Sequence, residues 1–522
     1  MTQEIELALN ALYLRQITTR EQLIREALRV AMTRASATAE MGVDELFSIM
    51  KFGTESKLGH FRADREDFYA IYMALSDIDL FDFVSAVCEN DREGHSAVPH
   101  LLTEYVCTRI AQRAPKSVLV PEAERVFSGL RSIIAASDGT VTITTQNNLF
   151  FQLLQFLFRD DPNISVRMLS IYMLLPMPEQ YDYIFCLPAF GGKVSQECAE
   201  FLTRDYDGVA LENLMKLLSE HGTLDFIAPA KITFASGGYD LLRKSVLDRY
   251  WVEQLMILPE GTFRPWTAIK TYLLSISSDS HDAVQVGELA AHKGTLEPSK
   301  WRTLTVEEFA GHGDWRIELL LSDDDENLRR FRESPTPKVK LREIADVFRG
   351  KSILKKDTAM GDIAVLNISD IEDGEIDYDH MDAITEDERK VKRYELQEGD
   401  VVLSCRGTAP KTAVFSQQGF QVIASANIIV LRLKGGFIPG YVRLFLESPV
   451  GSTMLQSFQR GSGLMNLSPA DLLELEISAL PEAEQSQIAN HYEEEKKRYK
   501  DAIAQAEQRI HDEKEQLFER MI

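Results

Sequence analysis

The sequence has few cysteines and no long apolar run, and these shortages narrow the possible classes of protein. Its 522 residues include five cysteines, with no Cys-x-x-Cys pair and no histidine-rich spacing. That pattern favours reduced thiols in a cytoplasmic protein and predicts no metal site. No run of about eighteen apolar residues is present, so a membrane span is not expected. Residues 1–30 carry acidic groups in a helical pattern, unlike a secretory signal.

Basic residues are in the minority, because 57 Lys and Arg stand against 81 Asp and Glu, for a net charge of -24. This balance disfavours general binding to nucleic acid, since neutralisation of phosphates drives such binding. DNA binding is still open, because basic residues gathered on one face are sufficient for it. The first part of the chain also lacks an aspartate followed by a spaced Glu-x-Lys on strand-like sequence, so we predict no nuclease there.

The length is sufficient for roughly two to four domains with their own cores. Residues 1–95 repeat apolar side chains every three or four positions, which predicts a helical domain. Residues 96–330 alternate β-branched strands with apolar helices, as in an α/β fold. The polar stretch 278–335, which begins inside this segment and ends just beyond it, is interpreted as a solvated linker. Short strands and turns predict a mixed α+β domain at 336–480, followed by one charged helix at 481–522.

The stretch from Tyr181 to Lys193, YDYIFCLPAFGGK, organises the α/β part. It reads as a buried strand that runs into a tight turn with Pro188 and two glycines. Turns at the carboxyl edge of a parallel sheet are where α/β enzymes place their chemistry. Further on, residues 211–277 contain two Leu-Pro or Ala-Pro strand ends, a basic helix and an Ile-Lys-Thr before the last strand.

These features resemble the gamma-class N6-adenine DNA methyltransferases, specifically the modification subunit of type I restriction systems. The family motif has an aromatic residue, an aspartate, two or three apolar residues and then Asn-Pro-Pro-Phe-Gly-Gly. This chain keeps the frame but reads Leu187, Pro188, Ala189 and Phe190 before its two glycines. The resemblance implies a Rossmann-like methyltransferase-type domain, capped by the helical amino-terminal domain.

The resemblance also shows which chemical groups are missing. In the family an Asn or Asp side chain polarises the acceptor amine, and Leu187 has no acceptor atom. Phe190 keeps the aromatic ring on which a flipped base could stack. After the strand 117–120 the family continues with a glycine-rich loop that approaches S-adenosylmethionine, because a Cβ would intrude there. The residues of this chain at that loop are Pro121, Glu122, Ala123, Glu124 and, at its end, Gly129.

With both motifs degenerate, no catalytic residues and no cofactor are expected. Two neighbouring side chains offer other chemistry. Asp182 is the nearest acid, but it begins the strand and is interpreted as structural. Cys186 suggests a thiol nucleophile, yet a buried cysteine that behaves as a small hydrophobe is the expected role.

The segment from Val339 onward resembles one target-recognition domain of a type I specificity subunit. Its Gly399-Asp400-Val401 turn and the closing residues 481–485 carry the likeness. The resemblance implies contact with double-stranded DNA, where arginine suits a guanine edge and lysine suits a phosphate. The candidate DNA-binding residues are Lys351, Lys355, Lys356, Arg406, Lys411, Arg460 and Ser462.

Residues 485–522 are highly charged, with apolar side chains spaced by three, four or seven from Ile488 to Met521. This narrow seam is typical of a coiled coil. In specificity subunits the corresponding helix pairs with a second one. The implied partners are a second copy or another specificity, methyltransferase or restriction subunit. The alternative, that the helix packs back on its own chain, stays open.

Together the two resemblances imply a sequence-specific DNA-binding protein of a restriction-modification-like system of bacterial phage defence. Its methyltransferase-like part would be a catalytically inactive scaffold, a pseudoenzyme. Two alternatives remain open. One is an active methyltransferase that uses S-adenosylmethionine with an altered motif, and the other is a regulator that binds a restriction protein rather than DNA.

Overall fold

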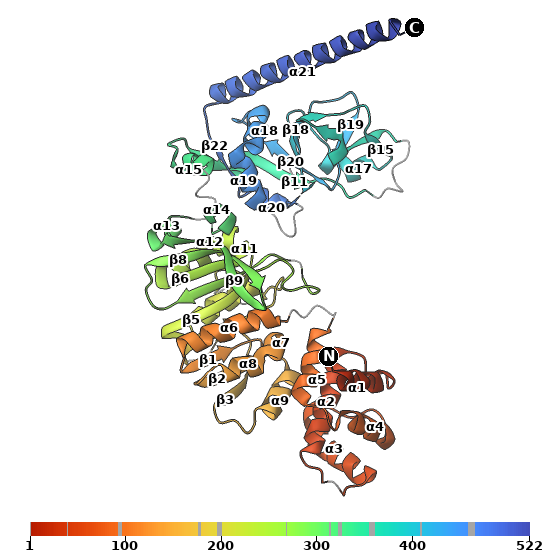
Figure 1. Cartoon of the computed structure of the whole chain (residues 1–522), viewed down its shortest axis with the longest axis vertical. Coiled ribbons are helices and arrows are strands. Elements are labelled where there is room, and N and C mark those ends of the chain that lie inside the picture. The colour runs from red at the N-terminus through yellow and green to blue at the C-terminus, as the bar shows by residue number, and fades with distance from the viewer. Residues whose placement is uncertain are drawn as a thin grey trace. The chain divides into compact units, whose positions relative to one another are not determined.

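The computed structural model comprises two compact units, residues 1–317 and 318–522, which we describe separately (Figure 1). The residues that the structure describes are 2–38, 40–91, 97–175, 179–195, 201–267, 269–312, 315–321, 326–353, 361–407, 410–457 and 465–521.

The first unit begins with a group of helices, as the apolar periodicity predicts. Four of these five helices start at a Thr or Asp whose side chain accepts a hydrogen bond from a backbone N–H of the first turn. The five helices are α1 (Gln3–Tyr13), α2 (Arg20–Arg34), α3 (Val43–Leu58), α4 (Arg65–Leu75) and α5 (Leu80–Glu89).

A nine-stranded mixed sheet forms the rest of this unit, in the order β3-β2-β1-β4-β5-β7-β6-β8-β9. The first five strands of that order are parallel, and β7 runs antiparallel to both β5 and β6. This is the strand order of the methyltransferase fold, so the predicted fold class is confirmed. The strands are β1 (Ser117–Val120), β2 (Thr140–Thr145), β3 (Ile164–Met168), β4 (Tyr181–Cys186), β5 (Leu218–Pro229), β6 (Trp251–Ile257), β7 (Thr271–Ser277), β8 (Ala283–His292) and β9 (Thr295–Thr305).

Helices connect the strands and cover the sheet. A buried ion pair holds one of them in place, because Arg109 on α6 donates to both carboxylate oxygens of Asp225 on β5, at 2.6 and 3.0 Å. Burial by itself raises the pKa of Asp225, but Arg109 holds that pKa below its usual value. The helices are α6 (His100–Arg113), α7 (Ala123–Val126), η1 (Phe127–Gly129), α8 (Leu130–Ala135), α9 (Asn148–Leu157), α10 (Tyr206–Met215), α11 (Lys231–Phe234), α12 (Gly238–Arg249) and α13 (Val306–Gly311). The short helix α14 (Ile317–Leu321) begins at the last residue of this unit.

The interpretation of residues 278–335 as a solvated linker is wrong. Strands β8 and β9 form a hairpin there, and β8 pairs with β6 and extends the sheet. Further along, α15 (Glu326–Glu333) buries Leu328 and Phe331. The polar composition of this stretch concealed a half-buried strand, in which the exposed Gln285 lies between the buried Val284 and Val286.

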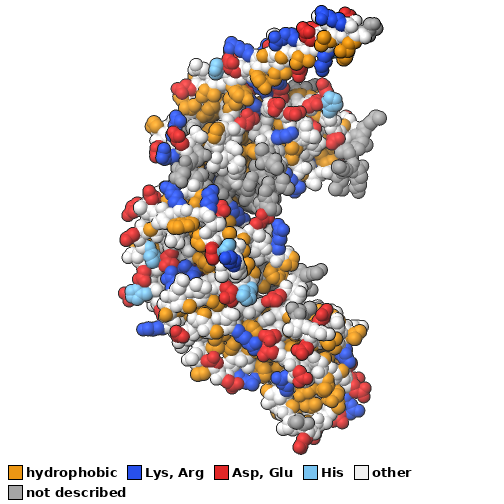
Figure 2. Space-filling model, in the orientation of Figure 1, with side chains coloured by type: hydrophobic (Ala, Val, Ile, Leu, Met, Phe, Trp, Pro, Cys, Tyr) orange, Lys and Arg blue, Asp and Glu red, His pale blue; other side chains and the backbone are white. Residues whose placement is uncertain are grey.

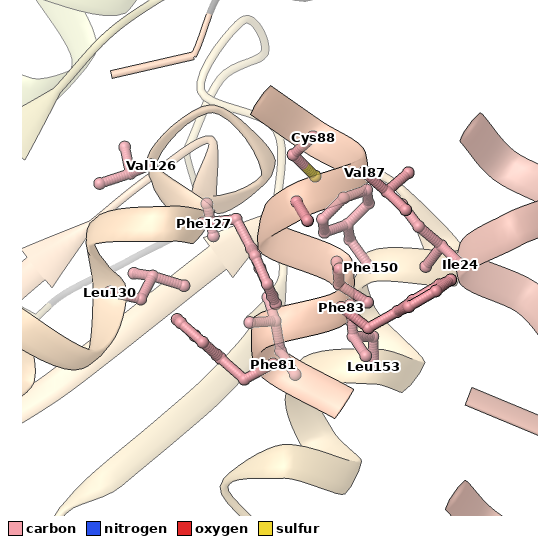
Figure 3. Packing of buried hydrophobic residues seen from close by; sticks show 14 of the residues in the cluster. Ile24, Phe81, Phe83, Val87, Cys88, Val126, Phe127, Leu130, Phe150 and Leu153 are labelled. Carbon is pink, nitrogen blue, oxygen red and sulfur yellow. The ribbon is translucent and has the colours of Figure 1, made fainter. Parts of the chain in front are cut away.

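The helical group and the sheet share one continuous core (Figure 3). Phe127, just after α7, stacks on Phe81 of α5 with ring centroids 4.7 Å apart, and it meets the edge of Phe150 of α9 at 5.8 Å. Aromatic pairs of this geometry stabilise beyond their buried area. The segment that follows β1 is therefore anchored in the hydrophobic core.

The second unit is rich in short strands, as the sequence predicts. It contains a four-stranded sheet of β11, β20, β16 and β18, a three-stranded sheet of β15, β12 and β19, and three two-stranded pairs. The strands are β10 (Lys338–Lys340), β11 (Ala345–Arg349), β12 (Ile363–Leu366), β13 (Ile371–Glu372), β14 (Glu375–Ile376), β15 (Asp382–Ile384), β16 (Val401–Ser404), β17 (Arg406–Gly407), β18 (Thr412–Val414), β19 (Gln421–Ala424), β20 (Ile428–Leu433), β21 (Met465–Asn466) and β22 (Glu476–Ser478).

Helices complete the second unit, and the longest of them is the predicted carboxyl-terminal helix. The longer helices after α15 are α18 (Pro439–Glu447), α19 (Pro449–Ser457) and α21 (Glu482–Glu519); the short ones are α16 (Leu341–Ile344), η4 (Ile368–Asp370), α17 (Glu388–Val391), η5 (Lys392–Tyr394) and α20 (Pro469–Leu472). Across the described parts of the chain, no helix combines the length and the apolar character that crossing a membrane requires.

Candidate cofactor and DNA-binding sites

The degenerate motif follows β4 and joins the core. Leu187 is fully buried in the same hydrophobic cluster as Phe185, and Pro188 is also buried. Ala189 and Phe190 are half-buried, and Phe190 packs against that cluster. The resembled family has a polarising amide at this position. Here the position is occupied by the apolar side chain of Leu187, which packs in the hydrophobic core.

The segment after β1 has a buried carboxyl in place of a glycine loop. Glu122 adopts a left-handed backbone, with φ 53° and ψ 46°, a conformation in which a Cβ is normally disfavoured. Its side chain is only 2 % exposed, and Ala123 is fully buried. Gly129, at the end of this segment, packs against α6, since an added Cβ would lie 2.6 Å from Oγ1 of Thr103.

Tyr172 connects these two degenerate segments, and sequence reasoning missed it. Its hydroxyl accepts a hydrogen bond from the Ala189 N–H at 2.7 Å and donates one to Oε2 of Glu122 at 3.1 Å. Its ring stacks on Tyr206 with centroids 4.3 Å apart and planes 22° apart. The retained Gly192 makes this stack possible, because an added Cβ would lie 2.2 Å from the Tyr206 ring.

The segment that carries Tyr172 is held from several sides. Asn213, a buried side chain on α10, donates from Nδ2 to the carbonyls of Ile171 and Met173 at 2.9 and 2.8 Å. The Leu169 N–H donates to the carbonyl of Thr145, at the end of β2. Because the two carbonyls that flank Tyr172 are both bonded, its ring is fixed between the segments after β1 and β4.

Burial shapes the electrostatics of this cluster. Burial raises the pKa of Glu122, the negative charge of Glu124 also raises it, and Arg125 opposes both effects, so that this pKa lies at about 7. The Arg125 guanidinium lies 3.6 Å from the Glu122 carboxylate. The Thr145 hydroxyl donates to the Glu124 carboxylate at 2.6 Å. The cluster thus links β1, β2 and the Tyr172 segment, although the second carboxylate oxygen of Glu122, Oε1, is buried without a hydrogen-bond partner among the described residues.

The two neighbours of the motif have the structural roles predicted for them. Cys186 is fully buried, and burial raises the pKa of its thiol well above the usual value, so it does not act as a thiolate. Asp182 accepts hydrogen bonds from the Lys116 N–H at 3.0 Å and the Ser219 hydroxyl at 2.7 Å. Among the residues that the structure describes, no three His, Cys, Asp or Glu side chains are grouped to hold a metal ion.

Three of the candidate DNA-binding residues lie in described parts of the second unit. The Lys351 ammonium is 3.3 Å from the Glu386 carboxylate, and the Lys411 ammonium donates to the carbonyl of Ile371 at 2.8 Å. Arg406 is exposed on β17. The Lys411 N–H donates to the Ser404 hydroxyl, so Arg406 and Lys411 belong to one turn after β16. Lys355, Lys356, Arg460 and Ser462 lie outside the described residues.

Known proteins resemble this chain over parts of its length. A family model described as the type I restriction modification DNA specificity domain matches residues 334–493. The type I restriction enzyme EcoEI methylase subunit of Escherichia coli is 27 % identical over 143 residues. That match covers 26 % of this chain and 29 % of the methylase subunit, so it spans less than a third of the relative's length.

Solved structures of the same kind resemble the chain at low identity. The methyltransferase subunit of a type I restriction-modification system from Streptococcus thermophilus matches with 12 % identity and a TM-score of 0.42, over 59 % of this chain and 82 % of that one. The M protein of the type I restriction enzyme EcoKI matches with 13 % identity and a TM-score of 0.30, over 59 % and 75 %.

The chain joins an α/β unit with the strand order of the methyltransferase fold to a β-rich unit. More particularly, residues 334–493 of the chain match the model of the type I restriction modification DNA specificity domain.

The buried Glu122 carboxyl predicts a pH-dependent stability. Its pKa in the folded chain, about 7, lies above the usual 4.5, so the stability it contributes is complete below 4.5 and is lost as the pH rises through 7. We expect the free energy of unfolding to fall by about 2–3 kcal/mol more between pH 5 and 8 in the unaltered protein than in Glu122→Gln. Denaturant titrations at both pH values measure the difference.

The exposed Glu220 provides the matched control for this prediction. Glu220→Gln is expected to retain the pH dependence of the unaltered protein. If Glu122→Gln retained it as well, Glu122 would not be the titrating group.

Proposed function

We propose that this protein is a sequence-specific DNA-binding component of a type I restriction-modification-like assembly, and that its methyltransferase-like unit is a scaffold that transfers no methyl group. The specificity domain supports the DNA-binding part of this proposal. The contacts of Tyr172 support the absence of catalysis.

The Tyr172 bridge is the observation that carries the proposal. Methyl transfer requires a donor in line with the acceptor amine, and a group that polarises the amine as it reacts. In the resembled family, the segments after β1 and β4 supply these two requirements. Here Tyr172 spans from Glu122 to Ala189, with a hydrogen bond to each segment. S-adenosylmethionine does not fit this arrangement, because the glycine backbone that would approach it is replaced by buried side chains.

The acceptor side is lost independently of the donor side. Leu187 is buried and apolar, so it cannot accept a hydrogen bond from an exocyclic amine. Loss of one oriented group of this kind typically lowers a rate by about two to three powers of ten. The side chain of Leu187 has no atom that accepts a hydrogen bond, and side chains of the protein fill the position of the methyl donor. The simplest account of both changes is that the unit is not catalytic.

Isothermal titration with S-adenosylmethionine tests the scaffold proposal. We expect no heat of binding at micromolar concentrations, because Tyr172 and Glu122 are held by the chain itself. An active relative that binds the donor under the same conditions is the positive control. Micromolar binding, or tritium transfer to adenine in duplex DNA, would instead establish the active methyltransferase and contradict the scaffold.

Selection of bound duplexes from a randomised library at low salt tests the DNA-binding proposal. We expect a specific sequence to be retained. Arg406→Ala should weaken its binding by about tenfold or more, since an arginine that contacts a base edge contributes about 1–3 kcal/mol. Lys244→Ala, a surface lysine of the other unit, is the control and should change nothing. If no sequence is retained, the regulator that binds protein rather than DNA is favoured.

Assembly is proposed to occur through the apolar seam of α21. Ile503, Ile510 and Leu517 lie on one side of this helix and are 40 %, 59 % and 48 % exposed. Figure 2 shows hydrophobic side chains along the helix between basic and acidic ones. A narrow seam of this type is stabilised by pairing with a second helix. A second copy of the chain, which brings a second specificity domain, would then let the pair read a split site.

Two substitutions in the seam test this pairing. Ile503→Asp combined with Ile510→Asp should convert a dimer to a monomer in light scattering, because each places a charge in a desolvated interface. Gln505→Asp, on the exposed opposite side of the same helix, should leave the dimer intact. A monomeric unaltered protein at high concentration would contradict self-pairing through α21.

A further inference from the structure

The amino-terminal part of α21 is attached to its own unit, whereas the seam described above continues beyond that attachment. Gln485 is fully buried and accepts a hydrogen bond from the Ile438 N–H at 2.9 Å. Ala489 lies against Gly440, where an added Cβ would approach it to 3.2 Å. One face of α21 thus packs against its own domain in the first turns. From Tyr499 onward the same face is exposed and forms the seam.

A small hairpin contacts α21 beyond this point. Strands β13 and β14 are joined by Asp373 and Gly374, whose φ values of 47° and 76° are those of a tight two-residue turn. The tip of the turn faces the helix. Lys496 on α21 donates to the carbonyl of Asp373 and pairs with the Glu375 carboxylate at 3.1 Å. Lys500, one helical turn later, pairs with the same carboxylate.

A buried arginine ties the same turn to the rest of the domain. Arg443 on α18 is 2 % exposed and donates to the carbonyl of Gly374 at 3.4 Å. It also pairs with Glu493 of α21 at 2.9 Å and lies over the ring of Tyr492 at 5.3 Å. Rearranging a buried charge of this kind is costly, because its partners must be replaced. The turn, α18 and α21 therefore meet at one fixed point.

The base of the hairpin reaches the turn that carries the candidate DNA-binding residues. Ile371, fully buried on β13, accepts the hydrogen bond from the Lys411 ammonium. Lys411 belongs to the turn with the exposed Arg406. The hairpin thus touches this turn at one end and α21 at the other, within a single compact unit.

We propose that the β13–β14 hairpin is a strut that fixes the direction in which α21 leaves the recognition domain and so sets the spacing between two DNA half-sites. In a paired molecule, half-site spacing follows from the geometry that relates the two recognition domains. A hairpin of two short strands and a two-residue turn has little freedom to bend. The inference rests on the proposed function, since a spacing exists only if paired copies bind DNA.

The test compares spacing preferences in duplexes that carry two copies of the selected half-site, separated by spacers of increasing length. In Gly374→Ala the added Cβ would lie 1.9 Å from Nη1 of Arg443, which displaces the turn from the helix. Glu375→Lys places a third positive charge beside Lys496 and Lys500. Each variant should reduce the enrichment of the preferred spacing by about tenfold, the effect of losing a coupled set of contacts.

Two controls separate the strut from general damage. Lys497→Ala removes an exposed lysine next to Lys496 and should leave the spacing preference unchanged. Combining Glu375→Lys with Lys496→Glu and Lys500→Glu restores opposite charges and should recover it. Binding to a single half-site should stay within about twofold in every variant, because the recognition turn itself is unaltered.

The outcomes distinguish this inference from the proposed function. An unchanged spacing preference in Gly374→Ala and Glu375→Lys would overturn the strut and leave DNA recognition in place. Equal loss of single half-site binding would also overturn it, since the hairpin would then only stabilise the domain. If the unaltered protein retains no DNA sequence, the proposed function itself fails. As a measurement without DNA, hydrogen exchange of residues 482–500 should become faster in both variants, and unchanged exchange would count against the strut.

Discussion

Two hydrogen bonds of the Tyr172 hydroxyl, to the Ala189 amide and to the Glu122 carboxyl, determine how the segments after β1 and β4 are arranged in the first unit. Strands β1 and β4 are neighbours in the sheet, so the segments that follow them lie side by side at its carboxyl edge. A molecule bound there would have to enter between these segments. A tyrosine that belongs to the chain occupies the space between these segments more readily than a dissolved ligand would, because the fold gives the tyrosine a high effective concentration there.

Several other features follow from that contact. The retained Gly192 leaves room for Tyr206, which stacks on Tyr172, so a glycine of the family motif is used here for packing. Phe127 ties the segment after β1 to the helical group through Phe81. The architecture of a catalytic fold is thus kept, while the side chains at its functional edge bond to one another and to the core.

The second unit depends on a different constraint, because one face of α21 is buried against its own unit at first and exposed further along. The first turns of α21 bury Gln485 and Ala489 against their own unit, and the later turns expose Ile503 and Ile510. The position of the exposed part is therefore determined by contacts made in the attached part.

Much of this organisation was predictable from the sequence because it depends on local pattern. The helical group, the strand that ends at Cys186, the absence of an amide at residue 187 and the seam of α21 all follow from periodicity and residue type. The strands at 283–305 were missed because polar side chains on their exposed face dominated the composition.

The sequence by itself determined the α/β character of the first unit, the long carboxyl-terminal helix and the apolar side chain at residue 187, since these are properties of single residues and short spacings. Only the tertiary structure decided which side chains occupy the positions of the family's reactive groups and which distant residues contact one another within each unit. Tyr172 meets Glu122 fifty positions away, and Lys496 on α21 meets Glu375 on β14 across more than a hundred. No local spacing encodes such encounters. They arise when the sheet and the helices bring distant segments together.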